Sequence, residues 1–159
     1  IKLSPKKKFG QNFIEDQVLL NEVVDLIEIE KKDIFVEIGP GTGNLTELII
    51  NKSTSCTSVE IDRNLVPLLE KRFKNIKGFN LINRDILSFD INTISEGEKS
   101  IRIAGNLPYN LSSPILEWSI KNINTIIDMH FMLQKEFAER CAGNENSKSY
   151  GKLLSLIHI

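Results

Sequence analysis

The stretch "IFVEIGPGTGNLTELII", residues 34–50, decides the fold of this chain. It opens with "IFVEI", a short apolar run of β-branched and aromatic side chains that predicts a buried strand. Its second half, "NLTELII", places apolar side chains on one face of a helix. The loop between the two halves contains three glycines, which are Gly39, Gly41 and Gly43. A strand, a glycine loop and a helix in this order predict the first unit of a parallel α/β sheet.

The same alternation of short apolar runs and amphipathic stretches continues along the chain. Four more runs predict strands, over residues 56–61, 79–83, 101–105 and 126–133. Apolar faces at helical spacing predict four helices. The first has its apolar face at Leu19, Leu20, Val23, Val24 and Ile27, and the second at Leu45, Leu48 and Ile49. The third has it at Leu65, Leu69 and Phe73, and the fourth face consists of Ile115, Leu116, Ser119 and Ile120. The third helix is expected to begin near Asn64, with Asp62 as its cap and Pro67 in its first turn. The pattern predicts a Rossmann-like α/β fold, a parallel sheet with helices on both faces.

Length and composition indicate one soluble domain. The chain has 159 residues with 20 basic and 21 acidic side chains, so it is not coated with charge of one sign. Cys56 and Cys141 are isolated thiols, which suits a reducing compartment and supports neither a disulfide framework nor a zinc site. No apolar run approaches the ~18 residues of a membrane span, and no signal peptide is recognisable. We expect a cytoplasmic protein with no membrane or metal partner; because the sequence begins at Ile1, residues are expected to be missing in front of it.

The glycine loop predicts a nucleoside site at the carboxyl ends of the strands, where such sheets bind ligands. Its spacing is not that of a dinucleotide fingerprint, and Asn44 stands where a phosphate-binding loop would carry lysine. Glu60 ends the second strand about twenty residues further on, where a carboxylate can accept both ribose hydroxyls. A nucleoside without a pyrophosphate, such as S-adenosylmethionine (AdoMet), fits Gly39, Gly41 and Glu60 best. The alternatives are a simple glycine turn and a solvated strand end.

Two more strands end in polar residues that belong at the same edge of the sheet. Asp85 follows the third strand and could accept a hydrogen bond from the exocyclic amine of an adenine; taken alone, it is a turn aspartate. After the fourth strand comes "GNLPYN", residues 105–110, whose simplest interpretation is a proline turn. Four successive strands thus carry a glycine loop or a polar group to one edge, and this convergence favours a ligand site.

The "NLPY" residues suit chemistry on an aromatic amine, which is a poor nucleophile because its lone pair is delocalised into the ring. If Asn106 and the main-chain carbonyl of Leu107 accept the two N–H hydrogens, the lone pair can point outward. Tyr109 can stack on the base, a contact of ~1–3 kcal/mol, and Pro108 stiffens the turn. A methyl sulfonium already has a neutral leaving group, so positioning can supply most of the rate without a strong base. His130, in an apolar strand, is expected to be a hydrogen-bonded core histidine.

With these residues in place, the chain resembles the AdoMet-dependent small-subunit ribosomal RNA adenine dimethyltransferases. The motifs that carry the resemblance, in order, are "FGQNF" (9–13), "EIGPGTGNLT" (37–46), "EID" (60–62), "RDIL" (84–87), "GNLPYN" (105–110), "MHFMLQKEFAERC" (129–141) and "NSKSYGKL" (146–153). The resemblance implies a class I methyltransferase fold and AdoMet contacts from Asn12, Ile14, Gly39, Glu60, Asp85 and Asn106, with residues 106–109 at the target adenine. It also implies N6,N6-dimethylation of two adjacent adenosines in a hairpin loop of small-subunit rRNA, within an assembling subunit.

The resemblance further implies what surrounds this catalytic domain. Members of the family continue into more strands and a small helical RNA-binding domain, so residues 1–159 are expected to form an incomplete, monomeric catalytic domain whose sheet ends after the fifth or sixth strand. Residues 153–159, "LLSLIHI", could form one more strand. Basic side chains that could hold RNA phosphates are Lys6, Lys7, Lys8, Lys135, Arg140 and Lys148. An ordinary solvated lysine cluster is the alternative for the first three.

Three other functions compete with this one. The rRNA methylases of macrolide resistance also modify adenine N6, although "GNLPYN" favours the small-subunit enzymes. A noncatalytic RNA-binding, ribosome-assembly or transcription-factor relative is the second, and the intact Asn106, Pro108 and Tyr109 argue against it. A nicotinamide dehydrogenase is the third, disfavoured by the glycine spacing and testable by NAD binding.

Overall fold

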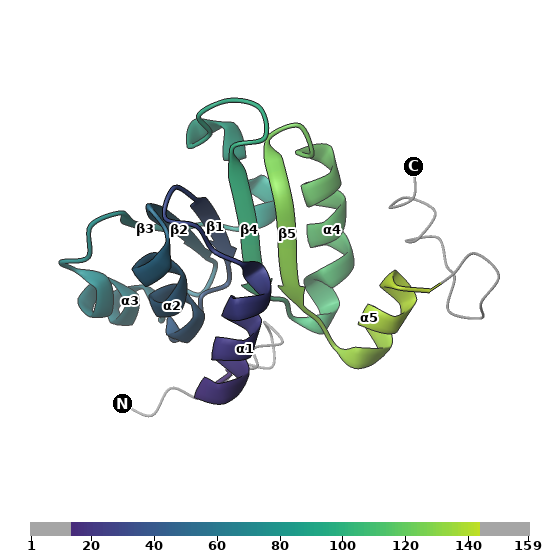
Figure 1. The fold of residues 1–159 in the computed structure, drawn as a ribbon, viewed down its shortest axis with the longest axis horizontal. Coiled ribbons are helices and arrows are strands. Elements are labelled where there is room, and N and C mark those ends of the chain that lie inside the picture. The colour runs from purple at the N-terminus through teal and green to yellow at the C-terminus, as the bar shows by residue number, and fades with distance from the viewer. Residues whose placement is uncertain (1–13, 144–159) are drawn as a thin grey trace.

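The computed structural model describes residues 14–143, which form one five-stranded sheet and the helices around it (Figure 1). The strands are β1 (Ile34–Ile38), β2 (Ser55–Glu60), β3 (Phe79–Asn83), β4 (Ile101–Asn106) and β5 (Ile126–Met132). The helices are α1 (Gln17–Ile27), α2 (Asn44–Lys52), α3 (Val66–Phe73), α4 (Ser112–Lys121) and α5 (Lys135–Cys141). Short 3₁₀ turns are η2 (Ile86–Ser88), η3 (Ile91–Thr93) and η4 (Tyr109–Leu111). The predicted α/β fold is confirmed.

The strand order is β3-β2-β1-β4-β5, and every neighbouring pair is parallel. The chain therefore starts in the middle of the sheet, builds outward through β2 and β3, and returns to the other side of β1. In Figure 1, α1 and α2 lie on the viewer's side of the strands, while α4 lies to the right of β5; its side chains pack on the opposite face from those of α1 and α2. The order reverses between β1 and β4, and in doubly wound sheets this switch point is where ligands bind.

Each face of the sheet carries its own hydrophobic core, because side chains alternate along each strand. On one face Phe35 and Ala104 pack with the apolar stripe of α1 and with Ile49 of α2. On the other face Ile103 packs with Ile115 and Trp118 of α4 and with residues of η2 and η3. Helices on both faces explain why the strands read as apolar runs rather than as alternating sequences.

The predicted boundaries are close to the observed ones, with small corrections. β1 and β3 have the expected ends, whereas β2 begins and ends one residue earlier, β4 extends to Asn106 and β5 stops at Met132. The prediction that Asp62 caps α3 was wrong. Its Oδ1 accepts from the backbone and side-chain N–H groups of Asn64, at 3.0 and 2.7 Å, and closes a turn before the helix. Leu65 takes the cap position without a side-chain bond, and Pro67 lies in the first turn as expected.

The apolar faces need two corrections. Leu19 was expected to pack inward but is 43% exposed, since α1 buries the stripe of Leu20, Val24 and Ile27. In α4 the buried side chains are Ser112, Ile115, Trp118 and Ser119, whereas Leu116 and Ile120 are only half-buried. The sequence analysis missed Trp118, whose indole N–H donates to the carbonyl of Phe89 at 3.2 Å.

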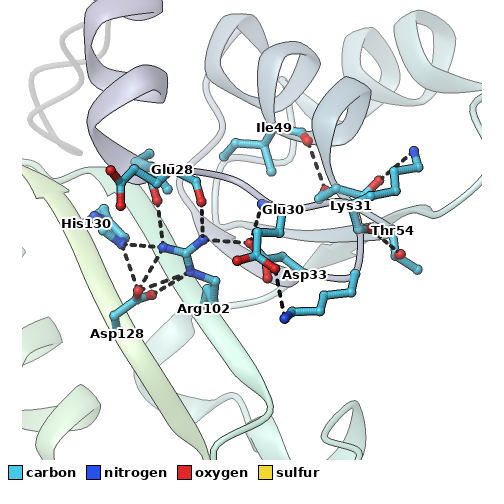
Figure 2. A network of polar contacts seen from close by, with 12 residues as sticks. Glu28, Glu30, Lys31, Asp33, Ile49, Thr54, Arg102, Asp128 and His130 are labelled. Atoms are coloured by element: carbon cyan, nitrogen blue, oxygen red, sulfur yellow. Dashed lines mark hydrogen bonds and ion pairs between the residues drawn. The ribbon is translucent and has the colours of Figure 1, made fainter.

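A buried arginine closes the amino edge of the sheet (Figure 2). Arg102 of β4 has a side chain only 10% exposed and donates to Asp33 at 2.6 Å and to both carboxylate oxygens of Asp128. It also donates to the carbonyls of Ile27 and Glu28 at the end of α1, at 2.7 and 3.3 Å. The guanidinium therefore joins α1, β4, β5 and the residue before β1.

His130 of β5 belongs to this cluster rather than to an apolar core. Its Nε2 lies 3.2 Å from Asp128 Oδ2 and 3.2 Å from a guanidinium nitrogen of Arg102, and its side chain is 26% exposed. The expected hydrogen bonding is confirmed, but the full burial is not. Burial alone would raise the pKa of Asp128, yet the hydrogen bonds from Arg102 and His130 lower it.

Replacing Arg102 tests this cluster. Arg102→Met should lower the free energy of unfolding by about 3–5 kcal/mol, because it leaves two carboxylates without their buried partner. Lys52→Met is the control, since the Lys52–Asp25 pair has side chains 48% and 75% exposed and should contribute less than about 1 kcal/mol. Denaturant unfolding of the three proteins measures both changes. Equal losses in the two variants would contradict the structural importance of Arg102.

Candidate active site

A pocket opens at the carboxyl ends of β1, β2 and β4, at the switch point of the sheet. It contains most of the site residues predicted from the sequence: Ile14, Gly39, Gly41, Glu60, Asp85, Asn106, Leu107 and Pro108. Tyr109 is not in its wall, and Asn12 lies outside the described residues. Residues nearly a hundred positions apart in the sequence thus line one pocket.

Two glycines allow the strand ends and the helix to approach one another around this pocket. Gly43 has a φ of 88°, and a Cβ there would lie 2.6 Å from the ring of Phe73 in α3. Gly105 of β4 lies so close to β1 that a Cβ would come within 2.7 Å of the Ile38 carbonyl oxygen. A side chain at Gly43 would therefore push the glycine loop away from α3, and one at Gly105 would push β4 away from Ile38 in the pocket wall.

Glu60 stands at the end of β2 and is 3% exposed. Its Oε1 accepts from the N–H of Asp62 at 2.7 Å, and its Oε2 accepts from the N–H of Gly41 at 3.3 Å. Burial raises the pKa of Glu60, although these two N–H groups lower it. An ionised carboxylate can accept about four hydrogen bonds, so the Glu60 side chain, which also lines the pocket, retains capacity for a ligand.

Asp85 and Arg84 line the pocket directly after β3. The Oδ1 of Asp85 accepts from the N–H of Leu87 at 3.0 Å and so begins η2. The turn interpretation of Asp85 is therefore correct, and it is compatible with the ligand interpretation because the second oxygen is not used in this bond. The sequence analysis missed Arg84 as a pocket residue. The only available signal was its position next to Asp85 at a strand end.

The "NLPY" turn is held at both of its ends. The N–H of Leu107 donates to the carbonyl of Met132 in β5 at 3.0 Å. The carbonyl of Pro108 accepts the N–H of Leu111 and the hydroxyl of Ser112, both at 3.0 Å. The Leu107 side chain is buried, whereas Tyr109 is 63% exposed. The turn therefore presents a fixed backbone to the pocket and an aromatic ring to solvent.

Glu37 is the main residue that the sequence analysis left without a role. It is 1% exposed, lines the pocket, and its Oε2 accepts the hydroxyls of Thr46 at 2.6 Å and Ser58 at 2.8 Å. Burial raises the pKa of Glu37 to about 7, even though both hydroxyls lower it, and nearby Glu60 raises it further. The available signal was a glutamate near the end of a strand whose other residues are apolar.

Asn44 and Arg72 form a second polar connection beside the pocket, also missed. The side-chain amide of Asn44 donates to the carbonyl of Ile14 at 2.9 Å. Arg72 of α3 donates to the carbonyl of Thr42 at 2.6 Å and to Oδ1 of Asn44 at 2.9 Å. The glycine loop is thereby tied to α3 on one side and to Ile14 on the other.

The predicted RNA-binding side chains are only partly described. Lys135 and Arg140 lie on α5, exposed, and α5 begins three residues beyond Met132, a pocket residue at the end of β5. Lys135 is 4.0 Å from Glu139 on the same helix. Lys6, Lys7, Lys8 and Lys148 lie outside the described residues, as does the expected strand in 153–159.

Comparison with known proteins places this geometry in a family. The family model described as ribosomal RNA adenine dimethylase matches residues 2–158. The chain belongs to this family. None of the helices within residues 14–143 is long and apolar enough to cross a membrane, and the same residues hold no cluster of three or more potential metal ligands.

Curated relatives in the family agree. The ribosomal RNA small subunit methyltransferase A of Pseudomonas syringae pv. tomato is 40% identical over 152 residues, 96% of this chain and 57% of the relative. That of Francisella tularensis subsp. tularensis is 43% identical over 153 residues, 96% of this chain and 58% of the relative. The chain spans a little over half the length of these relatives.

Solved structures support the same fold. A dimethyladenosine transferase from Plasmodium falciparum superposes with a TM-score of 0.77 at 24% identity, over 92% of this chain and 52% of its own. The 23S rRNA methyltransferase ErmE superposes with a TM-score of 0.70 at 24% identity, over 81% and 50%. These likenesses show that the fold is shared, and the family membership argues against the dehydrogenase alternative.

The buried carboxyl of Glu37 should make stability depend on pH. Because its folded pKa of about 7 exceeds the ordinary value of 4.5, the folded chain keeps a proton that the unfolded chain loses. The stabilisation that comes from this protonated carboxyl is complete below pH 4.5 and is lost as the pH rises through about 7. Over this range the free energy of unfolding falls by about 3 kcal/mol. Glu37→Gln should remove it, while Glu22→Gln on the exposed face of α1 should not. Denaturant unfolding at pH 5 and pH 8 compares the three, and an unchanged pH dependence in Glu37→Gln would contradict the assignment.

Proposed function

We propose that this chain is the catalytic part of an enzyme that transfers methyl groups from AdoMet to N6 of two adjacent adenosines in a small-subunit rRNA hairpin loop. The observation that carries the proposal is the single pocket that joins the glycine loop to the "NLPY" turn. Family membership and relatives named for small-subunit rRNA methylation support the substrate. In this proposal residues 1–159 belong to one AdoMet-dependent methyltransferase catalytic domain.

The pocket residues fit AdoMet. Glu60 is placed to accept ribose hydroxyls, Asp85 to accept from the adenine amine, and Gly39 and Gly41 to let the backbone approach the ligand closely. Ile61 and Ile86 add apolar wall on either side of these polar groups. Two buried carboxyls in one wall, Glu37 and Glu60, also suit a ligand that carries positive charge. When bound, AdoMet supplies a methyl group already activated by the sulfonium.

The turn fits a target adenine. Asn106 and the carbonyl of Leu107 are the two acceptors for the hydrogens of its N6 amine. No donor within residues 14–143 is hydrogen-bonded to the Leu107 carbonyl, whereas the Pro108 carbonyl accepts two. Tyr109, 63% exposed beside this turn, can stack on a base that arrives from solvent. Because the acceptors activate the amine and the donor has a good leaving group, positioning carries most of the catalysis.

The RNA and its setting are part of the same proposal. Lys135 and Arg140 on α5, together with Lys6, Lys7, Lys8 and Lys148, would contact phosphates. The substrate would be a small subunit during assembly, in the cytoplasm, and the enzyme would act as a monomer. A large-subunit rRNA methylase shares the fold, as ErmE shows, but the Pseudomonas and Francisella relatives described above are named for the small subunit. A noncatalytic role would not require the complete set of Asn106, Pro108 and Tyr109.

Cofactor binding is the first test. Calorimetric titration of this chain should show saturable AdoMet binding and no NAD binding. Glu60→Ala should weaken AdoMet binding by about 1–3 kcal/mol, which is roughly five- to 150-fold, because a charged hydrogen-bond acceptor is lost. Glu96→Ala serves as the control, because Glu96 is exposed and does not line the pocket. Equal affinities for the Glu60 and Glu96 variants would remove Glu60 from the cofactor site.

Methyl transfer is the second test. With small ribosomal subunits that lack adenine dimethylation, the protein should produce N6,N6-dimethyladenosine, and Asn106→Ala should reduce the rate at least a hundredfold because one acceptor at the reacting nitrogen is gone. AdoMet affinity and the thermal midpoint show whether Asn106→Ala still binds and folds. Transfer to large-subunit rRNA instead would favour the macrolide-resistance type, and near-normal turnover of Asn106→Ala would contradict the mechanism.

A further inference from the structure

Helix α4 carries two buried serines with nearly the same local geometry. Ser112 and Ser119 are 1% and 0% exposed. Each hydroxyl donates to the carbonyl four residues earlier, Ser112 to Pro108 at 3.0 Å and Ser119 to Ile115 at 2.9 Å. The acceptors differ in kind, because Ile115 is an ordinary residue of the helix while Pro108 lies in the "NLPY" turn.

We propose that Ser112 is a positioning residue for methyl transfer, whose hydroxyl holds the Pro108 carbonyl and thereby fixes the distance between the amine acceptors and the stacking ring of Tyr109. The inference rests on the proposed function. It concerns a residue outside the pocket wall, which acts through the backbone of the turn rather than by touching a ligand.

The backbone torsions of the turn explain why one hydrogen bond can have this effect. The proline ring fixes φ of Pro108, observed at −66°. The N–H of Leu107 is held by the Met132 carbonyl of β5, so the backbone before Pro108 is anchored to the sheet. The remaining rotation between the Leu107 carbonyl and Tyr109 is ψ of Pro108, observed at 144°. Because ψ sets the direction of the Pro108 carbonyl, the bond from Ser112 restrains this rotation directly.

Stability alone does not account for a serine at this position. The Pro108 carbonyl already accepts the N–H of Leu111 at 3.0 Å, so it would not be left unsatisfied without Ser112. Alanine at this first residue of α4 would occupy the same buried position and would leave the Pro108 carbonyl with the Leu111 N–H as its donor. The second donor therefore restrains the orientation of the Pro108 carbonyl, because a carbonyl that accepts from two donors has less rotational freedom than one that accepts from a single donor.

The matched serines give the experiment. Single-turnover methylation of small ribosomal subunits that lack adenine dimethylation, at saturating AdoMet, should be about tenfold or more slower for Ser112→Ala, as small misplacements in a reacting site are. Its Kd for AdoMet should stay within about twofold of the unsubstituted protein, since Ser112 does not line the pocket. Ser119→Ala loses an equivalent buried bond and should keep the transfer rate within about twofold.

A second pair of variants covers the case in which Ser112→Ala folds poorly. Ser112→Thr and Ser112→Val introduce the same branched shape and differ by the hydroxyl. Thr should retain most of the rate and Val should lose it. Equal rates for Ser112→Ala and Ser119→Ala, or for the Thr and Val variants, would overturn the proposal.

Hydrogen exchange separates this inference from the proposed function. The Leu111 amide should exchange faster in Ser112→Ala than in Ser119→Ala, because its shared acceptor has become less ordered. If the unsubstituted protein binds no AdoMet or methylates no subunit, the proposed function fails, and the exchange comparison then decides the role of Ser112 in the turn by itself. Equal exchange of the Leu111 amide in both variants would show that Ser112 does not order the turn.

Discussion

The guanidinium of Arg102 is the interaction on which the arrangement of this domain depends. It donates to carboxylates just before β1 and in β5 and to carbonyls at the end of α1, so four segments far apart in the sequence meet at one charge (Figure 2). It also lies 5.3 Å from the ring centroid of Phe35 in β1, within the range of a cation–π contact. A charge in this position is stable only while all its partners are present, and that requirement fixes the relative positions of the segments.

The two ends of β4 differ in what their polar residues do. Arg102 lies near its amino end and Asn106 at its carboxyl end, a separation of roughly 13 Å at the rise of a strand. Polar groups at the amino end bond to one another and close that edge of the sheet. Polar groups at the carboxyl end surround a pocket and keep some of their capacity for a ligand. Rigid closure of one edge thus holds in place the strands whose other ends form the site.

The electrostatics of the pocket follow from burial more than from charge pairing. Glu37 and Glu60 are held by hydroxyl and backbone N–H donors, and no basic side chain within residues 14–143 is among their hydrogen-bond partners. Burial therefore raises the pKa of both groups. A cationic ligand would favour their ionised forms, so the binding of such a ligand and the loss of a proton are expected to be coupled. The wall of the pocket is in this sense complementary to a sulfonium, a group that no neutral nucleoside carries.

The sequence predicted the parts of the site that depend on strand order, and it missed those that depend on packing depth. Glycine spacing and the ends of four strands were enough to bring Gly39, Glu60, Asp85 and Asn106 together, because parallel strands end at one edge. Local periodicity does not distinguish Glu37, because its hydrogen bonds to two hydroxyls form only once the strand is packed beneath α2. Trp118 was missed for the same reason, since its position on the buried face depends on the exact rotation of α4.

Ser112 shows where this limit lies. Its sequence context, "NLSSPILEW", offers two neighbouring serines, and only the first is buried and bonded to the turn. A sequence pattern can place a serine near the "NLPY" turn, but which hydroxyl donates to the Pro108 carbonyl depends on how η4 passes into α4. The 3₁₀ turn brings the helix start back over the residues that precede it, so a side chain of the helix reaches the backbone of the turn. The "NLPY" turn is consequently held by the helix that follows it as well as by the strand that precedes it, and its rigidity depends on the fold and not on the motif alone.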